Sequence, residues 1–506
     1  MSNHQLDYKK RTIQLIIVAT ALRLLLATIA ELNNDEAHYW TYGKHLQWNY
    51  FDHPPMIAVW IRFFTAGLQW NHELFIRLGS VLGAALSTWL MYLIGKKLKD
   101  EYTGFIAACL YTASFYSSII AGVLILPDSP QLVFWLLSVC LMADIIKSAS
   151  ISNYKLLLLG VAIGFCILSK VHGVFCWAGF IAYCLFNKRS VFKNPFLYIS
   201  ILVTLVMLVP SFIWSMNNQF STYDYHSNRI IIRHVQIDSF FGELFGSFLY
   251  NNPVNIVLLI MALFYFRMNP SSPERSGRTL ILWLGIPLIA TVLFLSIFND
   301  TLPHWSGPAY TTLIPITAMY LSARSILFTR RSLKYAIGLT AFALVVAFSI
   351  INFWPGTLGS KSMPDYGKND VTLDMTGWRQ FGNDFSNYYK KEAALNNKKP
   401  KYIFSNYWFP AGHLDFYVAH PMNINVIGFG RVQDIHHFAW LNKYLPPLQQ
   451  GDWAYYITIS NFNEPPPQKL IENFREVSTP VLIKQMRNGA IARYFYVYAL
   501  KGYKGN

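Results

Sequence analysis

Charged residues are scarce in this chain, and long apolar runs take their place. Asp, Glu, Lys and Arg make up 13% of the 506 residues, against 53% hydrophobic and 16% aromatic residues. So little charge excludes an ordinary soluble enzyme, and the length exceeds that of one compact domain. The composition therefore predicts a polytopic membrane protein.

Cysteine is also scarce, and the sequence lacks both a metal-type pair spacing and a secreted disulfide framework. The five cysteines all lie in apolar stretches, at Cys109, Cys140, Cys166, Cys176 and Cys184. We therefore expect free thiols in the protein core or facing lipid.

The cations form neither a basic face nor a nucleic-acid motif. The formal net charge is +16, but Lys and Arg are scattered in small clusters between apolar runs, which argues against nucleic acid as a partner. The first apolar run, 12–31, has no small-residue cleavage site and is too long for a signal-peptide core. We expect it to be a retained membrane span.

A membrane-crossing helix needs roughly 20 mostly apolar residues. About eleven runs meet this measure, near 12–31, 76–95, 103–122, 129–147, 154–170, 172–187, 196–214, 248–266, 279–298, 306–327 and 334–353. The segment 55–70 is shorter and begins at Pro54-Pro55, which favours an amphipathic helix lying at the membrane interface. The predicted fold class is a polytopic α-helical membrane domain, residues 1–353.

The positions of the basic residues predict which side of the membrane each connection faces. Basic clusters occupy alternate connections, which the positive-inside rule places in the cytoplasm, at residues 9–11, 96–99, 147–155, 188–193, 267–278 and 324–334. The N-terminus is then cytoplasmic, and loop 32–75 faces outside.

After Phe353 the chain becomes polar, with the length and turn signals of a folded domain. With eleven spans this C-terminal domain, 354–506, is extracytoplasmic. Apolar and aromatic patterning predicts a small α/β domain, with strands at 401–405, 423–428, 453–460 and 493–500 and helices at 377–397 and 409–419.

The outside loop 32–75 carries the most informative residues, because it places carboxylates beside aromatics at the membrane edge. Asp35 and Glu36 are adjacent and diverge on a helix, so one can act as a catalytic acid or base while the other supports it. The alternative is a helix whose first-turn acids favour the helix dipole. Asp52 and His53 precede two prolines that fix the backbone, and a helix cap at Asp52 is the alternative there.

Further candidates lie near the outer ends of other spans. Arg229 could bind a phosphate through forked hydrogen bonds, and His226 a phosphate or a metal, unless their loop is simply a solvated basic connector. Asp128 fits a helix cap and a substrate contact equally well. Lys170 and His304 fit either substrate binding or interfacial anchoring.

The motifs DEAHYW, YFDHPPM, LPD, YDYHSNR and PHWSGPAY occur in this order. Together they resemble polyprenyl-phosphate-dependent glycosyltransferases of the GT-C type, especially bacterial relatives of protein O-mannosyltransferases and lipid A aminoarabinose transferases. The resemblance covers residues 12–353, and GWRQFGNDF and YWFPAGHLDFYV in the tail are also similar to bacterial members.

The resemblance implies roles for these residues. Asp35 matches the catalytic base, and Arg229 is the candidate phosphate clamp, assisted by His53 and Lys170. Asp52 and His226 match a metal-binding carboxylate and histidine, so a divalent metal ion is the one cofactor left open. Aminoarabinose transferases have a lysine where His53 stands, so phosphate binding by His53 depends on its protonation.

The predicted function is inverting transfer of a sugar from a polyprenyl-phosphate donor to an extracytoplasmic acceptor at the bacterial cytoplasmic membrane. An envelope lipid such as lipid A or lipopolysaccharide is preferred over a glycan or a protein acceptor. Two other classes remain open. One is a transporter or flippase of an isoprenoid-linked substrate, and the other is an envelope scaffold whose tail binds glycans through Trp378, Tyr407 and Trp408.

Overall fold

The computed structural model describes residues 7–148, 150–227, 231, 234–270, 273–396 and 399–505. Its contacts divide the chain into two compact units. The first, helical unit comprises Met1–Thr28 and Gln47–Ala343, and the second unit comprises Ile29–Leu46 and Leu344–Asn506. The segment that holds Asp35 and Glu36 thus groups with the C-terminal residues. The sequence-based boundary after Phe353 stays a prediction.

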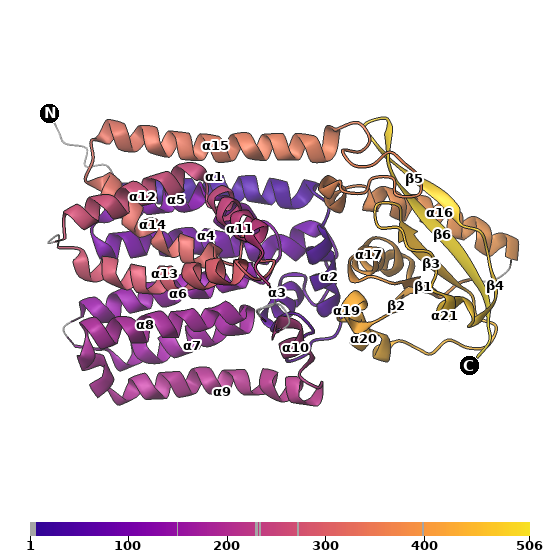
Figure 1. Cartoon of the computed structure of the whole chain (residues 1–506), viewed down its shortest axis with the longest axis horizontal. Coiled ribbons are helices and arrows are strands. Elements are labelled where there is room, and N and C mark those ends of the chain that lie inside the picture. The colour runs from indigo at the N-terminus through magenta and orange to yellow at the C-terminus, as the bar shows by residue number, and fades with distance from the viewer. Residues whose placement is uncertain are drawn as a thin grey trace. The chain divides into compact units, whose positions relative to one another are not determined.

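The first unit is a bundle whose long helices run alongside one another (Figure 1). Its helices are α1 (Tyr8–Ile29), α3 (Met56–Phe64), α4 (Glu73–Leu98), α5 (Glu101–Thr112), the π-helix η1 (Tyr116–Ile120), α6 (Asp128–Lys147), α7 (Asn153–Ser169), η2 (Val171–Gly173), α8 (Val174–Asn187), η3 (Arg189–Lys193), α9 (Pro195–Asn217), α10 (Ser221–Ser227), α11 (Ile237–Tyr250), α12 (Pro253–Met268), α13 (Arg275–Ser296), α14 (Gly307–Ser322) and α15 (Ile326–Phe353).

Within the described residues, six helices are long and apolar enough to cross a membrane, or seven if the bent pair α11 and α12 forms one span. Two shorter apolar helices follow each other at Asn153–Ser169 and Val171–Asn187. The chain is a multi-pass membrane protein, as expected. The count of about eleven spans stays a prediction. The five cysteines are free and buried, also as expected.

Polar and small residues join the helices of this unit. The carbonyl of Gly160 in α7 accepts a hydrogen bond from Thr204 Oγ1 of α9 at 2.7 Å. A Cβ at Gly160 would lie 2.3 Å from the Ser200 carbonyl oxygen, so only glycine allows this approach. Close backbone contact between small residues is a usual basis of helix association in membranes.

Two of the expected single helices are interrupted, the first where distant side chains contact its last carbonyls and the second before a proline. The helix predicted for 103–122 stops at Thr112 because side chains from other helices satisfy its last carbonyls. Asn252 Nδ2 donates to the Ala113 carbonyl at 2.8 Å, and Asn255 Nδ2 donates to the Leu110 carbonyl at 3.0 Å. The helix predicted for 248–266 breaks before Pro253, which lacks an amide hydrogen and disfavours a helical residue before it. Asn252 has φ +67°, and α11 and α12 meet at 97°.

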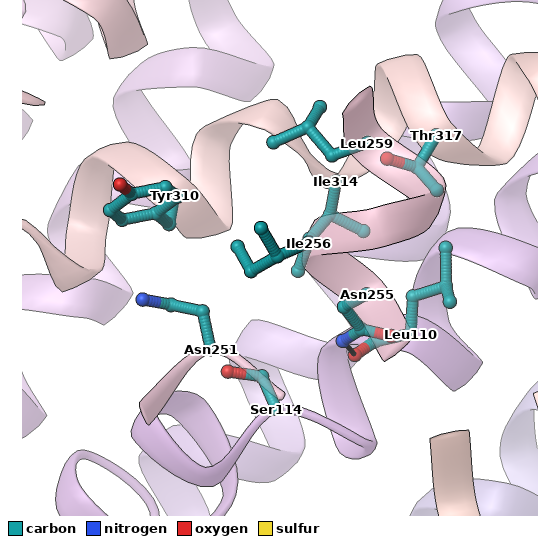
Figure 2. Close-up of a pocket in the computed structure, with 9 residues that line it drawn as sticks. All are labelled: Leu110, Ser114, Asn251, Asn255, Ile256, Leu259, Tyr310, Ile314 and Thr317. Carbon is teal, nitrogen blue, oxygen red and sulfur yellow. Dashed lines mark hydrogen bonds between the residues drawn. The ribbon is translucent and has the colours of Figure 1, made fainter. Parts of the chain in front are cut away.

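A small cavity lies beside the break between α11 and α12 (Figure 2). It has a volume of about 10 Å³, close to the space of one water molecule. The lining combines apolar side chains with polar ones: Leu110, Ser114, Asn251, Asn255, Ile256, Leu259, Tyr310, Ile314 and Thr317. It is too small for a sugar or a lipid, so it is part of the packing around the break.

The interfacial helix predicted for 55–70 is shorter in the structure, at Met56–Phe64. A turn of left-handed residues, Ala66 to Leu68, ends it. Val59 and Phe63 are exposed while Ile57 and Ile61 are fully buried. Both faces of α3 therefore carry apolar side chains, as a helix packed on the bundle and facing lipid requires.

The second unit is an α/β domain joined by the segment 29–46. Its elements are α2 (Asn34–Tyr42), η4 (Val371–Met375), α16 (Trp378–Asn396), β1 (Tyr402–Ser405), α17 (Trp408–Leu414), the π-helix η5 (Asp415–Ala419), α18 (His420–Met422), β2 (Asn425–Gly428), α19 (Val432–Ile435), α20 (Phe438–Leu441), η6 (Asn442–Tyr444), β3 (Ala454–Ile459), α21 (Gln468–Ile471), β4 (Phe474–Val477), β5 (Val481–Arg487) and β6 (Ala490–Tyr503).

One mixed sheet organises this unit. Strands β2, β1 and β3 are parallel neighbours in that order, and β6 pairs antiparallel with β3, β4 and β5. Alternating side chains fill two cores, one on each face of the sheet. Ile403 and Ile457 belong to the core that also holds α16 and α17, while Phe404 and Tyr456 belong to the opposite core.

The predicted α/β tail is confirmed, including all four predicted strands and both helices. The strands β4 and β5 were not predicted. β4 is only four residues long, and β5 has mostly exposed residues at the edge of the sheet. Both therefore lack the continuous apolar signal of the buried strands.

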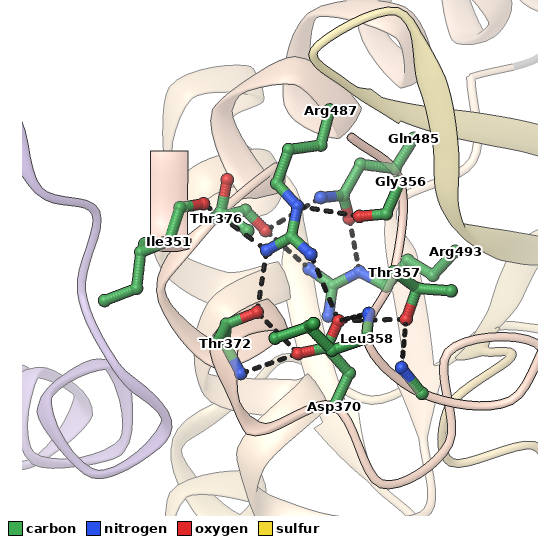
Figure 3. A network of polar contacts seen from close by, with 11 residues as sticks. Ile351, Gly356, Thr357, Leu358, Asp370, Thr372, Thr376, Gln485, Arg487 and Arg493 are labelled. Atoms are coloured by element: carbon green, nitrogen blue, oxygen red, sulfur yellow. Dashed lines mark hydrogen bonds and ion pairs between the residues drawn. The ribbon is translucent and has the colours of Figure 1, made fainter. Parts of the chain in front are cut away.

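A buried ion pair fixes the start of this domain after α15 (Figure 3). Arg487 Nη2 lies 3.1 Å from Asp370 Oδ2, and the two side chains are 2% and 0% exposed. Arg487 Nε also donates to the Gly356 carbonyl at 2.7 Å, and the Leu358 amide donates to Asp370 at 2.7 Å. The network satisfies both charges with hydrogen bonds, which a buried ion pair requires.

We expect the substitution Asp370→Ala to lower the free energy of unfolding by about 3–5 kcal/mol, because it leaves the buried Arg487 charge without its partner. Thermal and urea unfolding of the purified full-length protein would measure the loss. Asp365→Ala is the matched control, since Asp365 pairs with Lys368 where both side chains are about half exposed. Equal losses in the two variants would contradict this account of the network.

Candidate active site

The first unit contains a buried ion pair between two residues singled out from the sequence, Asp128 and Lys170. Lys170 Nζ lies 3.0 Å from Asp128 Oδ1 and 2.9 Å from Oδ2. The side chains of Lys170 and Asp128 are 6% and 2% exposed. Asp128 is the first residue of α6, and Lys170 follows the last residue of α7 in an extended conformation. The ammonium group thus donates hydrogen bonds to both carboxylate oxygens, where the start of α6 meets the end of α7.

Tyr116, which the sequence analysis missed, completes the environment of Asp128. Its hydroxyl donates to Asp128 Oδ1 at 3.0 Å, and its ring is fully buried in η1. A Cβ at Gly307 would lie 2.3 Å from that ring, so glycine at the start of α14 makes room for the tyrosine. A tyrosine inside an apolar run gives no signal that separates this role from core packing.

His304 lies close to the same pair, in the loop between α13 and α14. Burial and the Lys170 ammonium group lower the pKa of His304 to about 4. A histidine with this pKa is neutral at pH 7 and offers one hydrogen-bond donor and one acceptor. The ring of His172 lies 6.0 Å from the ring of Trp305, which follows His304. The start of α6, the end of α7 and the start of α14 therefore bring Asp128, Lys170 and His304 together.

A buried glutamate, Glu243 of α11, holds the loop that carries His304. It is 1% exposed and accepts hydrogen bonds from Thr301 Oγ1 at 2.9 Å and Ser306 Oγ at 3.1 Å. Glu243 was not among the residues predicted from the sequence. One feature of the sequence could have identified this glutamate. It is the single acid within the apolar run FFGELFGSF, where a charge needs a partner.

The structure also brings the YFDH and YDYH motifs together within the first unit. His226 Nε2 donates to the backbone carbonyl of Asp52 at 2.8 Å, and the rings of His53 and His226 are 6.2 Å apart. Thr222 Oγ1 donates to the Tyr50 carbonyl at 2.7 Å. A metal shared by the side chains of Asp52 and His226 would have to use Nδ1 of the histidine, because Nε2 is engaged by the carbonyl. Arg229 lies outside the described residues.

Asp35 and Glu36 lie in the second unit, in the first turn of α2. The Glu36 amide donates to Asn33 Oδ1 at 2.8 Å, and the Asn33 amide donates to Glu36 Oε2 at 3.0 Å. This reciprocal pair is a capping box, and it gives the fully buried Glu36 a structural role. Asp35 is exposed. Of the two adjacent acids, Asp35 is therefore the one that can reach a substrate.

Two further contacts within the second unit fix the start of α2. His413 Nε2 lies 3.0 Å from Asn34 Oδ1, and its ring stacks on Trp378 with 4.1 Å between centroids. Burial and the nearby Arg493 keep the pKa of His413 well below its usual value, so the ring is neutral. The Trp378 amide donates to Glu31 Oε2 at 2.8 Å. These contacts join the residues just before DEAHYW to Trp378 of GWRQFGNDF and to His413 of YWFPAGHLDFYV.

Three comparisons with known proteins agree with this architecture. Residues 52–214 match the family model described as dolichyl-phosphate-mannose-protein mannosyltransferase, a stretch that includes Asp52, Asp128 and Lys170. The structure of ArnT from Cupriavidus metallidurans bound to undecaprenyl phosphate is similar over 96% of this chain and 97% of that one, with a TM-score of 0.66 and 15% identity. The chain has a GT-C glycosyltransferase fold.

The sequence is also similar to lipid A galacturonosyltransferase RgtD of Rhizobium johnstonii (strain DSM 114642 / LMG 32736 / 3841). The two are 23% identical over 295 residues, which is 57% of this chain. The matched region spans 60% of the length of that relative. ArnT in the apo state gives a similar structural match, with a TM-score of 0.63 and 14% identity over 96% of this chain and 97% of that one. The resemblance to GT-C glycosyltransferases expected from the motifs is confirmed.

We expect Asp128→Asn and Lys170→Met each to destabilise the protein by about 3–5 kcal/mol, because each leaves one buried charge unpaired. The double variant should lose clearly less than the sum of the two. Unfolding of the four proteins in detergent forms a double-mutant cycle that isolates the coupling. The pair Lys96 and Glu101, with both side chains 45% exposed, is the matched control and should show little coupling. Additive losses at Asp128 and Lys170 would contradict a buried ion pair.

Proposed function

We propose that this protein transfers a sugar from a polyprenyl-phosphate donor to an envelope glycolipid of the lipid A type, with inversion at the anomeric carbon. The observation that carries the proposal is the buried pair of Asp128 and Lys170, where three helix ends of a GT-C fold meet. A cation held in such a place suits the phosphate end of an isoprenoid donor whose chain lies among apolar helices.

The donor phosphate would compete with Asp128 for Lys170. In the donor the phosphate is a diester with one negative charge, like Asp128, whereas the polyprenyl phosphate released by transfer is a monoester with about −1.5 to −2 charge at pH 7 and three strong acceptor oxygens. The ammonium group can therefore move its hydrogen bonds from the carboxylate to the phosphate as the sugar is transferred. Neutral His304 can donate one further hydrogen bond. Arg229 and His53 remain our candidates for additional phosphate contacts.

Lys170 would also favour the departure of the polyprenyl phosphate. As the bond between the anomeric carbon and the phosphate oxygen breaks, negative charge grows on that oxygen. A positive group already fixed beside it stabilises the transition state more than the ground state. This leaving group needs charge stabilisation rather than a proton, because its second pKa is about 6.

Asp35 is the proposed general base. A hydroxyl of the acceptor attacks the anomeric carbon while its proton passes to the Asp35 carboxylate. The bond from that carbon to the phosphate oxygen breaks, and polyprenyl phosphate leaves from the opposite side. General-base catalysis of this kind contributes about 10²- to 10⁴-fold to a rate. Glu36 supports the base indirectly, since its capping box with Asn33 fixes the first turn of α2.

The acceptor class follows from the relatives. RgtD is by its printed name a lipid A galacturonosyltransferase, and we extend lipid A to this chain as the preferred acceptor. A protein acceptor, suggested by the description of the matching family model, is the alternative. We also propose that the chain lies in the bacterial cytoplasmic membrane, with its N-terminus in the cytoplasm and its C-terminal domain outside, because basic clusters occupy alternate connections.

We expect Asp35→Asn to lower sugar transfer at least about 100-fold while the protein stays folded, because the amide keeps the shape but cannot accept the proton. Mass spectrometry of envelope glycolipids from cells with either protein would show the missing sugar and its acceptor together. Asp238→Asn is the matched control, since Asp238 is also exposed in the first turn of a helix, and it should keep full activity.

Two results would contradict this assignment. Unchanged transfer by Asp35→Asn would remove Asp35 as the base. Movement of a polyprenyl-linked sugar across lipid vesicles by the purified protein, without cleavage of the sugar-phosphate bond, would favour a transporter instead.

A further inference from the structure

The parallel strands of the second unit form a topology that creates ligand sites in many α/β proteins. β1 pairs with β2 on one side and with β3 on the other. The chain leaving β1 enters α17, whose Leu414 packs in the core on one face of the sheet. The chain leaving β3 reaches α21, whose Leu470 packs in the core on the other face. Ligands of open α/β sheets bind at such points, beyond the carboxyl ends of the strands.

Asn406 and Tyr407 directly follow β1, and Phe462 and Glu464 lie in the segment after β3. These polar and aromatic side chains contact one another. Glu464 Oε1 accepts a hydrogen bond from the Tyr407 hydroxyl at 2.7 Å, and Glu464 Oε2 accepts one from Asn406 Nδ2 at 2.7 Å. The rings of Tyr407 and Phe462 meet edge to face with 4.4 Å between centroids. Glu464 is exposed and Phe462 is 37% exposed. The carboxylate is thus held in one orientation beside an accessible aromatic ring, and it has about two further lone-pair positions.

Two more polar groups at this edge have no hydrogen-bond partner among the described residues. Ser405 Oγ, at the last residue of β1, is buried and the residue is 0% exposed. Asn461 Oδ1, two residues after β3, is also a buried atom without a partner. Buried polar groups are nearly always satisfied, so each of these two oxygens has the capacity to accept a hydrogen bond from an ordered water or from a ligand.

The chemistry of this edge favours a neutral ligand with several hydroxyl groups. The Glu464 carboxylate would repel an anion, and the nearest guanidinium, that of Arg431, is paired with Asp434 at 2.7 Å and 3.1 Å. A sugar ring presents neighbouring hydroxyl groups to a carboxylate and a C–H face to an aromatic ring. Trp378, a glycan-binding candidate in the sequence, is instead fully buried in the core.

We propose that the carboxyl edge of β1 and β3 is a saccharide-binding site, formed by Asn406, Tyr407, Phe462 and Glu464. Asn406 and Tyr407 orient the carboxylate, Glu464 accepts hydrogen bonds from two hydroxyl groups of the sugar, and Phe462 covers one face of its ring. This site is separate from the residues proposed for sugar transfer. The saccharide-binding proposal does not depend on the proposed transfer function.

The test measures binding of a neutral probe, methyl β-D-glucopyranoside, to the full-length protein in detergent by saturation-transfer NMR and calorimetry. We expect binding to the wild type and at least tenfold weaker binding to Glu464→Gln and to Phe462→Ala. Phe462 is partly exposed, so its substitution preserves the fold if Glu464→Gln does not. Glu476→Gln is the matched control, because Glu476 is an exposed carboxylate on β4 with a lysine partner, and it should bind like the wild type.

Three outcomes would overturn the proposal. These are the absence of probe binding to the wild type, equal binding to the wild type and to both site variants, and displacement of the probe by inorganic phosphate. Asp35→Asn should bind the probe normally, so a failed transfer reaction and a failed saccharide site give different results.

Discussion

The ion pair of Asp128 and Lys170 inside the helical unit is the interaction on which the candidate site depends. Removing two charges from water costs several kcal/mol for each ion, and only close geometry with additional hydrogen bonds offsets that cost. Here the carboxylate oxygens lie 3.0 Å and 2.9 Å from the ammonium group, and Tyr116 donates a further hydrogen bond. Such a pair adds little stability over an apolar replacement. Its value lies in holding a cation ready at the meeting point of α6, α7 and α14.

The two adjacent acids of the DEAHYW motif have different environments in the fold. Glu36 is buried and closes the capping box with Asn33, so it sets where α2 begins. Asp35, one residue earlier, is then exposed on the first turn. Glu243 stands in a similar relation to His304, because its hydrogen bonds to Thr301 and Ser306 hold the loop between them. In both cases a buried carboxylate fixes the backbone that presents the residue beside it.

The sequence predicted most of the fold but only part of the candidate site. Apolar length and alternation identified the membrane protein, the α/β tail and its four buried strands, because burial leaves a periodic pattern. The pairing of Asp128 with Lys170 joins residues 42 positions apart, which no local pattern reveals. The role of Tyr116 was not predicted, because a tyrosine within an apolar run has the same sequence pattern as a residue that only packs in the core. The end of α5 at Thr112 depends on side-chain donors far away in the sequence, Asn252 and Asn255, whereas Pro253 marks the break at Asn252 in the sequence itself.

Binding of undecaprenyl phosphate, the carrier that transfer from an undecaprenyl-phosphate donor would release, is the decisive test of the role of Lys170. The measurement compares undecaprenyl phosphate with undecaprenol, the alcohol without the phosphate, by native mass spectrometry of the protein in detergent. The double variant Asp128→Asn/Lys170→Met suits it because no buried charge is left unpaired. We expect the wild type to prefer the phosphate and this preference to fall at least tenfold in the double variant, a change of about 1.4 kcal/mol. An unchanged preference in that variant would contradict the assignment of Lys170 to the donor phosphate.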